Sequence, residues 1–278
     1  MPLVPSAEVL LPARQAGRGV GAFNVIQLEH AEALVAGAER AGSPVILQIS
    51  QNAARYHGSL EPIGLATLAV ARASSAPVVV HLDHATDEAL VDAAIGLGFT
   101  SVMFDASVLD YAENVSRTAE VVRRAHDSGV WVEAELGEVG GKDGVHAPGV
   151  RTDPGEAAAF VEATGIDALA VAVGSSHAMT SRTATLDFQR IGELAGAVTV
   201  PLVLHGSSGV SDSDIARAVT AGLTKINIAT HLNVTLTAAL RSYLADHPDV
   251  VDPRKYLGVG RDALVAETAR LIGVIAGR

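Results

Sequence analysis

The chain has 278 residues, of which 49% are hydrophobic and 18% are charged, and its formal net charge is −11. This length favours one large α/β domain, and the acidic balance without any Lys/Arg block argues against nucleic acid and anionic membranes as partners. Cysteine is absent, which excludes disulfides and thiolate metal sites, and no apolar run reaches the ~18 residues of a membrane span. The first residues lack the basic region of a signal peptide, so we expect a cytoplasmic protein.

Short apolar runs alternate with Ala-rich amphipathic segments along the chain. The expected strands cover 19–25, 44–50, 77–84, 101–107, 130–136, 168–174, 201–206 and 225–230. The expected helices cover 28–42, 61–75, 87–97, 111–128, 155–165, 187–196, 211–222 and 260–276. Candidate N-caps are Asp87, Asp110, Asp153, Asp187 and Ser211. Strict βα alternation implies a parallel sheet, and eight units favour closure. The sequence therefore predicts a single (β/α)8 TIM barrel over 1–278 with a C-terminal helical extension.

Polar side chains concentrate where the expected strands end, which is the side of a TIM barrel that carries the active site. They are Asn24, Ser50, Asp83, His84, Asp105, Glu133, Glu135, His177, His205, Asn227 and Thr230. Three histidines after different strands, beside a carboxylate pair, are typical of catalytic zinc with one open position. The alternative for each histidine is a hydrogen-bonded core residue.

The remaining histidines are assigned by their place in the pattern. His30, His126 and His247 lie on expected helices, where we predict surface positions. His81 shares a strand face with Asp83 and is expected to be a partner residue or part of the core. His57 and His146 are loop residues without a predicted role.

Two loops are rich in small and hydroxyl residues. Gly206, Ser207 and Ser208 follow the seventh expected strand, and 227–230 ends the eighth. Small residues let backbone N–H groups approach an anion at the start of a helix. Phosphate binding by the loops after strands seven and eight recurs in this fold. The pair of loops predicts a phosphate site, with ordinary Gly/Ser turns as the alternative.

Four motifs occur in one order: HLDHA (81–85), VEAELGEVGG (132–141), HGSSGV (205–210) and KINIAT (225–230). With them the chain resembles the class II, metal-dependent ketose-bisphosphate aldolases, whose members include fructose- and tagatose-bisphosphate aldolases. The resemblance extends from 21 to 257. It implies a glycolytic type of lyase that reversibly cleaves a ketose 1,6-bisphosphate to dihydroxyacetone phosphate and glyceraldehyde 3-phosphate. It also implies Zn²⁺ as cofactor, a monovalent cation near the phosphate, and a homodimer or homotetramer.

The resemblance also implies roles for single residues. His84, His177 and His205 would bind the zinc ion, and Glu135 would serve an alternative metal position. Asp83 would be the acid/base group for the hydroxyl at the cleaved bond. The expected substrate-binding residues are Asn24, Ser50, Gly206, Ser207, Ser208, Asn227, Ala229 and Thr230, with Arg254 reaching a neighbouring subunit.

Two positions depart from the family pattern. Lys142 stands where a loop carboxylate is expected, and Ala178 stands where glycine usually follows the zinc histidine. Asp143 or Glu138 could replace the loop carboxylate. These departures leave open another ketose phosphate, such as a deoxy-keto-gluconate phosphate, and a non-catalytic zinc barrel that binds a sugar phosphate.

Two other enzyme classes are disfavoured. A Schiff-base aldolase needs a lysine of lowered pKa inside the barrel. The chain has three lysines, of which Lys225 alone lies on a strand, and we expect it to pair with Asp105 or Glu133. A zinc hydrolase of this fold would show an HxH pair on the first strand, where Asn24 stands.

Overall fold

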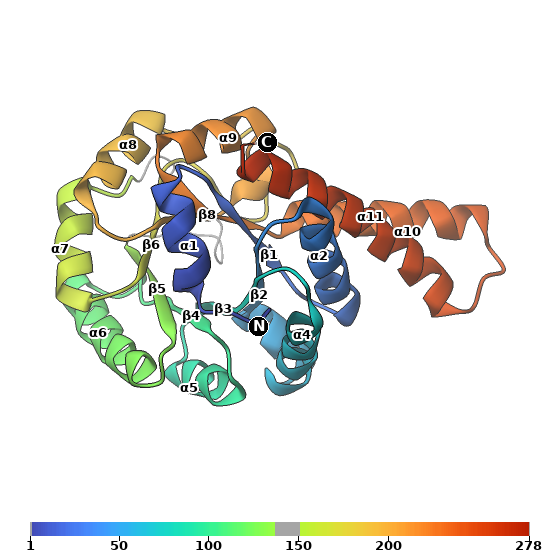
Figure 1. The fold of residues 1–278 in the computed structure, drawn as a ribbon, viewed down its shortest axis with the longest axis horizontal. Helices are drawn as coiled ribbons and strands as arrows, with labels where there is room; N and C mark the ends of the chain where they lie inside the picture. Colours follow the sequence, from blue (N-terminus) through green and yellow to red (C-terminus); the bar gives the residue numbers. More distant parts are fainter. Residues whose placement is uncertain (1, 137–150, 278) are drawn as a thin grey trace.

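A computed structural model describes residues 2–136 and 151–277. Over these residues, eight parallel strands close into a barrel in chain order, from β1 to β8 (Figure 1). The strands are β1 (Val20–Asn24), β2 (Val45–Ser50), β3 (Val78–Ala85), β4 (Ser101–Phe104), β5 (Trp131–Leu136), β6 (Ala168–Val171), β7 (Leu202–Leu204) and β8 (Leu223–Ile228). Closure is made by β1 and β8, where Val20 pairs with Lys225. The predicted TIM barrel is confirmed.

Helices follow the strands and surround the barrel. Their bounds are α1 (Ser6–Gln15), α2 (Leu28–Ala41), α3 (Gln51–His57), α4 (Glu61–Ala73), α5 (Glu88–Leu97), α6 (Tyr111–Asp127), α7 (Pro154–Thr164), α8 (Phe188–Ala197), the 3₁₀ turn η1 (Ser207–Gly209), α9 (Asp212–Ala221), α10 (Thr230–Asp246) and α11 (Pro253–Ile275). Each predicted N-cap side chain accepts a hydrogen bond from a backbone N–H of the first turn, as N-caps do.

Helix α1 was not predicted from the sequence. Its interior Pro12 obscures the helical pattern, because proline usually ends a helix. The buried face of α1 packs Val9 and Leu10 against Val20 and Ile46 of the strands. The helix therefore closes the end of the barrel at which the strands begin.

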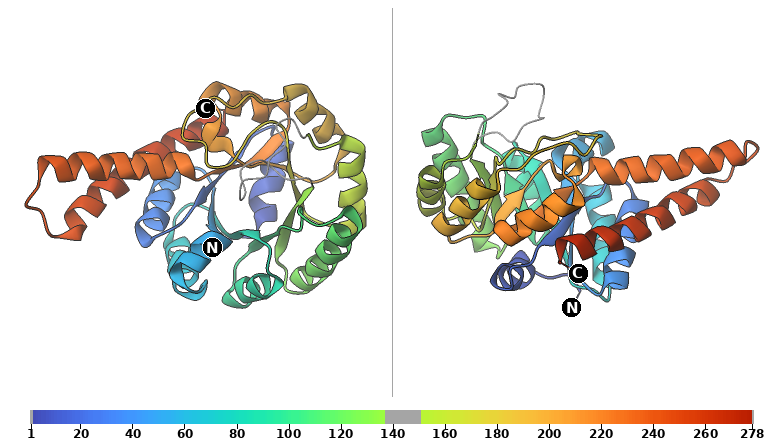
Figure 2. Two further views of the ribbon diagram at one scale, coloured as in Figure 1. Left: turned by 180° about the vertical axis from the view of Figure 1, so that it is seen from behind. Right: turned by 90° about the horizontal axis from the view of Figure 1, so that it is seen from above.

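Helices α10 and α11 form an antiparallel hairpin that extends away from the barrel in both views (Figures 1 and 2). Helix α11 begins at Pro253 rather than at 260, because Asp252 caps it and proline suits the first helical position. Its later part packs on α2, where Gly37 lets Thr268 approach. Among the described residues, none of the helices could span a membrane.

Candidate active site

Asp83 and His84 come from a break in the regular pairing of β3. The β3–β4 register shifts between Leu82 and Ala85, and His84 adopts a left-handed φ of 50°. In a regular strand, neighbouring side chains point to opposite faces. The bulge places both side chains at the same pocket, so a carboxylate and an imidazole are adjacent in sequence and in space.

The three predicted histidine ligands come together at the carboxyl ends of the strands. Ring centroids lie 4.5 Å apart for His84 and His205, 5.0 Å for His84 and His177, and 5.7 Å for His177 and His205. One ring nitrogen from each lies within 4.8 Å of the others. Three converging imidazoles, which bind a metal in their neutral form, are a donor set that suits a catalytic divalent metal such as zinc.

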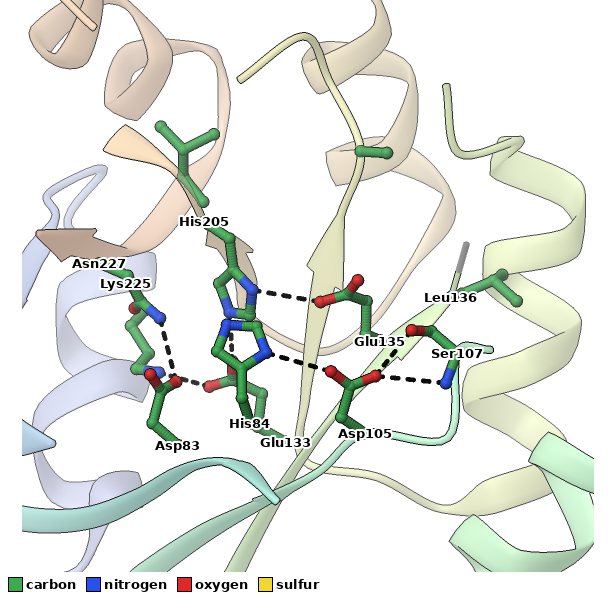
Figure 3. A network of polar contacts seen from close by, with 12 residues as sticks. Asp83, His84, Asp105, Ser107, Glu133, Glu135, Leu136, His205, Lys225 and Asn227 are labelled. Atoms are coloured by element: carbon green, nitrogen blue, oxygen red, sulfur yellow. Dashed lines mark hydrogen bonds and ion pairs between the residues drawn. The ribbon is translucent and has the colours of Figure 1, made fainter. Parts of the chain in front are cut away.

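Two carboxylates contact ring nitrogens of the histidine cluster and help to fix the orientation of the rings (Figure 3). Asp105 Oδ2 lies 3.1 Å from His84 Nδ1, and Glu135 Oε2 lies 3.2 Å from His205 Nδ1. His84, Asp105 and Glu135 also form a second group whose ligand atoms lie within 4.8 Å of one another. The described residues thus contain a histidine-rich group that fits a metal, with carboxylates as further donors. Asp105 was noted at its strand end, but no metal role was predicted for it.

The charges of the site oppose the effect of burial. Burial alone would lower the pKa of His205, but its hydrogen bonds to Glu133 and Glu135 outweigh this and raise the pKa to about 9. Burial would raise the pKa of Asp83, but its electrostatic interactions with His84 and Lys225 outweigh this and hold the pKa below its usual value. Asp83 is therefore ionised at neutral pH and can accept a proton.

The pocket contains most of the residues that were predicted to bind substrate. Its lining is Asn24, Gln48, Ser50, Asp83, His84, His177, Ala178, Gly206, Ser208, Asn227, Ala229 and Thr230. Gln48 was not predicted, because it lies in the middle of a strand rather than at its end. Its Nε2 donates to Asn24 Oδ1 at 2.7 Å and lies 3.5 Å from Asp83 Oδ2. Gln48 therefore helps to fix the carboxylate.

Four predicted residues, Ser207, Glu135, Arg254 and His205, do not line this pocket. Ser207 is buried, and its hydroxyl donates to the carbonyl of Leu204. Glu135 and His205 are also buried and lie side by side, with Glu135 Oε2 3.2 Å from His205 Nδ1. The side chain of Arg254 is 89% exposed and pairs with Asp252 at the start of α11. Lys142, Asp143, Glu138 and His146 lie outside the described residues.

The predicted phosphate loop depends on glycine at its first position. Gly206 has a φ of 67°, and a Cβ there would lie 2.5 Å from the carbonyl oxygen of Ser176. The loop then continues as η1, and Ser208 Oγ accepts a hydrogen bond from the backbone N–H of His231 in the first turn of α10. Because the N-terminus of this long helix opens at the pocket, its N–H groups favour a bound anion there.

The other histidines follow the predictions with one exception. His126 and His247 are exposed, and His81 is a buried partner residue whose Nδ1 lies 2.8 Å from Ser101 Oγ. His30 is only 1% exposed, so its predicted surface position is wrong. The physical reason is the helical hairpin, since α11 packs across α2 and buries the face that carries His30.

Lys225 is buried and held by an ion pair. Its Nζ lies 2.7 Å from Glu133 Oε2, which confirms one of the two predicted pairings. The residue does not line the pocket, so the described structure gives a Schiff-base lysine no access to substrate.

The fold and this site define a TIM-barrel enzyme with a histidine-rich centre and an adjacent ionised carboxylate. Residues 4–277 match the family described as "Fructose-bisphosphate aldolase class-II". The chain is 44% identical over 268 residues to a "Probable fructose-bisphosphate aldolase" of Bacillus subtilis, covering 95% of this chain and 94% of that one. It is 43% identical over 270 residues to a "Fructose-bisphosphate aldolase" of Geobacillus stearothermophilus, covering 96% and 94%.

Among solved structures, the crystal structure of the YdjI aldolase from Escherichia coli K12 superposes with a TM-score of 0.88. It shares 33% identity and covers 98% of this chain and 97% of its own. The chain belongs to the class II fructose-bisphosphate aldolase family. Membership of this family confirms the predicted class of activity, an aldolase that acts as a carbon–carbon lyase in carbohydrate metabolism.

Proposed function

We propose that the chain reversibly cleaves fructose 1,6-bisphosphate or its tagatose epimer to dihydroxyacetone phosphate and glyceraldehyde 3-phosphate. The observation that carries this proposal is a single pocket that joins the histidine cluster, Asp83 and the N-terminus of α10. Metal, base and anion site are the parts that cleavage of a phosphorylated ketose requires.

His84, His177 and His205 would hold Zn²⁺, with Glu135 as an alternative donor beside His205. A bound zinc ion would act as a Lewis acid that stabilises the negative charge developing on the substrate carbonyl. Since imidazoles are neutral ligands, they leave the full charge of the ion available. A monovalent cation near the phosphate stays a prediction.

Asp83 is the proposed acid/base residue. Its carboxylate is ionised and buried, and it lies beside His84 at the wall of the pocket. Asn227 Nδ2 lies 3.5 Å from Asp83 Oδ1, and Gln48 approaches the other oxygen. The carboxylate would accept the hydroxyl proton at the bond being cleaved and return it in the condensation direction.

One phosphate of the substrate would bind where Gly206, Ser207 and Ser208 meet the first turn of α10. Asn227, Ala229 and Thr230 complete that side of the pocket, and Asn24 and Ser50 close the other. Among the described residues that line the pocket, none is Lys or Arg. The second phosphate therefore needs a cation from elsewhere, and Arg254 of a neighbouring subunit is the proposed source.

This assignment of Arg254 requires an oligomer, and we propose a homodimer or homotetramer. Arg254 is exposed in the first turn of α11, next to the turn that joins α10 and α11. The α10–α11 hairpin extends away from the barrel (Figure 2), which leaves this end free to contact another copy. Symmetric assemblies commonly complete one subunit's site with a neighbour's side chain in this reciprocal way. The proposal also retains the predicted cytoplasmic location.

The test is aldol cleavage of fructose 1,6-bisphosphate, tagatose 1,6-bisphosphate and a deoxy-keto-gluconate phosphate. Each is measured before EDTA treatment, after it, and after zinc is added back. We expect activity on a ketose 1,6-bisphosphate that is lost on chelation and restored by zinc. Turnover of the gluconate-derived substrate alone would overturn the bisphosphate assignment, and activity that survives complete metal removal would overturn the zinc assignment. Tight zinc and phosphate binding without turnover would indicate a non-catalytic barrel.

A further inference from the structure

A line of buried polar side chains crosses the barrel interior beneath the pocket. It joins Ser101, His81, Lys225, Glu133 and His205, which come from β4, β3, β8, β5 and the end of β7. The side chains of His81, Lys225, Glu133 and His205 are at most 2% exposed. None of these groups lines the pocket, and Figure 3 shows Lys225 beside the histidine rings and Glu133 behind His84.

Glu133 divides its two oxygens between a lysine and a histidine. Oε2 accepts from Lys225 Nζ at 2.7 Å, and Oε1 lies 3.0 Å from His205 Nε2. Because an ionised carboxylate only accepts hydrogen bonds, the hydrogen of this contact belongs to Nε2 of His205. Lys225 fixes which oxygen faces the histidine, and it also lies 3.4 Å from His81 Nε2.

A hydrogen on Nε2 decides what the other nitrogen of His205 can do. Without a metal, the contact of Nδ1 with the Glu135 carboxylate favours a hydrogen on that nitrogen as well, and the ring is charged. A metal can replace only one of the two hydrogens; with Nε2–H held by Glu133, the lone pair available to the metal lies on Nδ1. Nδ1 is the atom that lies 3.2 Å from Glu135, which belongs with His84 and Asp105 to a group that could hold a metal. The nitrogen with the lone pair therefore lies beside a proposed metal donor.

We propose that Glu133, whose other oxygen is paired with Lys225, is a positioning residue that holds His205 in the Nε2–H tautomer and presents Nδ1 to the metal. This inference rests on the proposed zinc site. Partners of this kind fix the ring orientation and tautomer of a ligand, and losing one typically weakens metal binding by about 10–100-fold.

A purely structural role is the competing explanation. Buried ion pairs can be replaced by apolar residues of similar volume with little loss of stability. If Glu133 and Lys225 only fill the barrel, removing the hydrogen-bond acceptor from position 133 should not matter for metal affinity. A pair of variants that differ in this acceptor alone separates the two roles.

The two variants are Glu133→Gln/Lys225→Met and Glu133→Met/Lys225→Met. Both remove the two buried charges and keep similar side-chain volumes. In the first, the amide oxygen can still accept from His205 Nε2, while the amide N–H₂ faces His81 Nε2, which lies 3.8 Å from the present Oε2. In the second, position 133 has no acceptor.

Zinc affinity of the metal-free proteins is measured by competition with a chromophoric chelator, and thermal unfolding checks that each variant is folded. We expect Glu133→Gln/Lys225→Met to stay near wild-type affinity and Glu133→Met/Lys225→Met to bind about 10–100-fold more weakly. The ¹⁵N spectrum of the histidine rings in the zinc-loaded proteins is the second measurement. It should show Nε2–H for His205 in the wild type and the Gln variant, and lose this single form in the Met variant.

Equal zinc affinities for the two folded variants, or an unchanged His205 tautomer in the Met variant, would overturn the inference. Wild-type protein that binds no zinc would instead contradict the proposed function. The two failures are therefore distinguishable without an activity assay.

Discussion

Asp83 and Asn227 lie 144 residues apart in the sequence, yet Asn227 Nδ2 is 3.5 Å from Asp83 Oδ1 across the mouth of the barrel. Both residues are buried, and both line the same pocket. The amide N–H₂ points at the charged form of the carboxylate and favours it. This contact orients the Asp83 carboxylate without neutralising its charge, as its proposed role as a base requires.

We expect Asp83→Asn to lower kcat for cleavage by about 10²–10⁴-fold, because an amide cannot accept the hydroxyl proton. Zinc content, measured by elemental analysis, should stay at the wild-type level, since Asp83 does not belong to the metal-fitting groups. Asp187→Asn is the matched control, because Asn caps a helix as well as Asp does and α8 should be unaffected. Retention of more than a tenth of kcat by Asp83→Asn would contradict the assignment.

Ala178 stores backbone strain beside His177, one of the three proposed zinc ligands. Its φ is 57°, a region that costs a residue with a Cβ roughly 1–2 kcal/mol. Ala178→Gly should therefore stabilise the fold by up to about 1 kcal/mol, after the greater freedom of glycine in the unfolded chain is subtracted. Urea unfolding of the metal-free protein measures this change.

The matched control for Ala178 is Ala216→Gly within α9, which should destabilise by up to about 1 kcal/mol, as glycine does in a helix. If both variants lose the same stability, the left-handed backbone of Ala178 is not strained.

Two buried histidines should make the metal-free protein sensitive to acid. Burial lowers the pKa of His30, and burial together with the charge of Lys225 lowers the pKa of His81 to about 3. In the unfolded chain both would bind a proton near pH 6.5, so below this pH the unfolded state holds more protons. Stability therefore falls as the pH drops, by about 1.4 kcal/mol per pH unit for each histidine that stays neutral in the fold.

Urea unfolding between pH 7.5 and 5 tests the contribution of His30. His30→Gln should remove its share of the slope, because glutamine does not titrate, whereas His247→Gln at an exposed position should leave the slope unchanged. Equal slopes for His30→Gln and wild type would show that His30 does not remain neutral.

The elements that the sequence predicts well are those with local causes. The strands are apolar runs and the N-caps satisfy the first turn of their own helix, so Asp87, Asp110 and Asp153 could be named without tertiary information. The site followed from the same logic. Once the strands were placed, the polar residues at their ends had to meet at one side of the barrel.

The features that could not be predicted from the sequence depend on packing between distant segments. The burial of His30 requires the α10–α11 hairpin to return across α2, and nothing near residue 30 encodes this. Gln48 looks like a polar interruption of a strand until Asn24 and Asp83 are seen beside it. The bulge at His84 likewise appears only in the register between β3 and β4.

The proposed role of Arg254 makes the most specific prediction about assembly. Arg254→Met should raise KM for the bisphosphate and lower kcat/KM by about 10²-fold or more, as expected when a charge-assisted phosphate contact is lost. Asp83→Asn should also lose activity, because it lacks the proton-accepting carboxylate, but it keeps an intact Arg254. If Arg254 acts in the neighbouring subunit, a hybrid of the two variants contains one complete site, formed by Asp83 of one chain and Arg254 of the other.

Mixing the two variants under conditions that exchange subunits tests this arrangement. For a reciprocal dimer, random exchange should restore about a quarter of wild-type activity, because half of the dimers are hybrids and each has one complete site. The control mixes Asp83→Asn with a double variant that carries both substitutions, which forms no complete site and should stay inactive. Hybrids confirmed by mass spectrometry that show no recovery would place the second phosphate on another group, and a monomer by light scattering would exclude Arg254 from the site altogether.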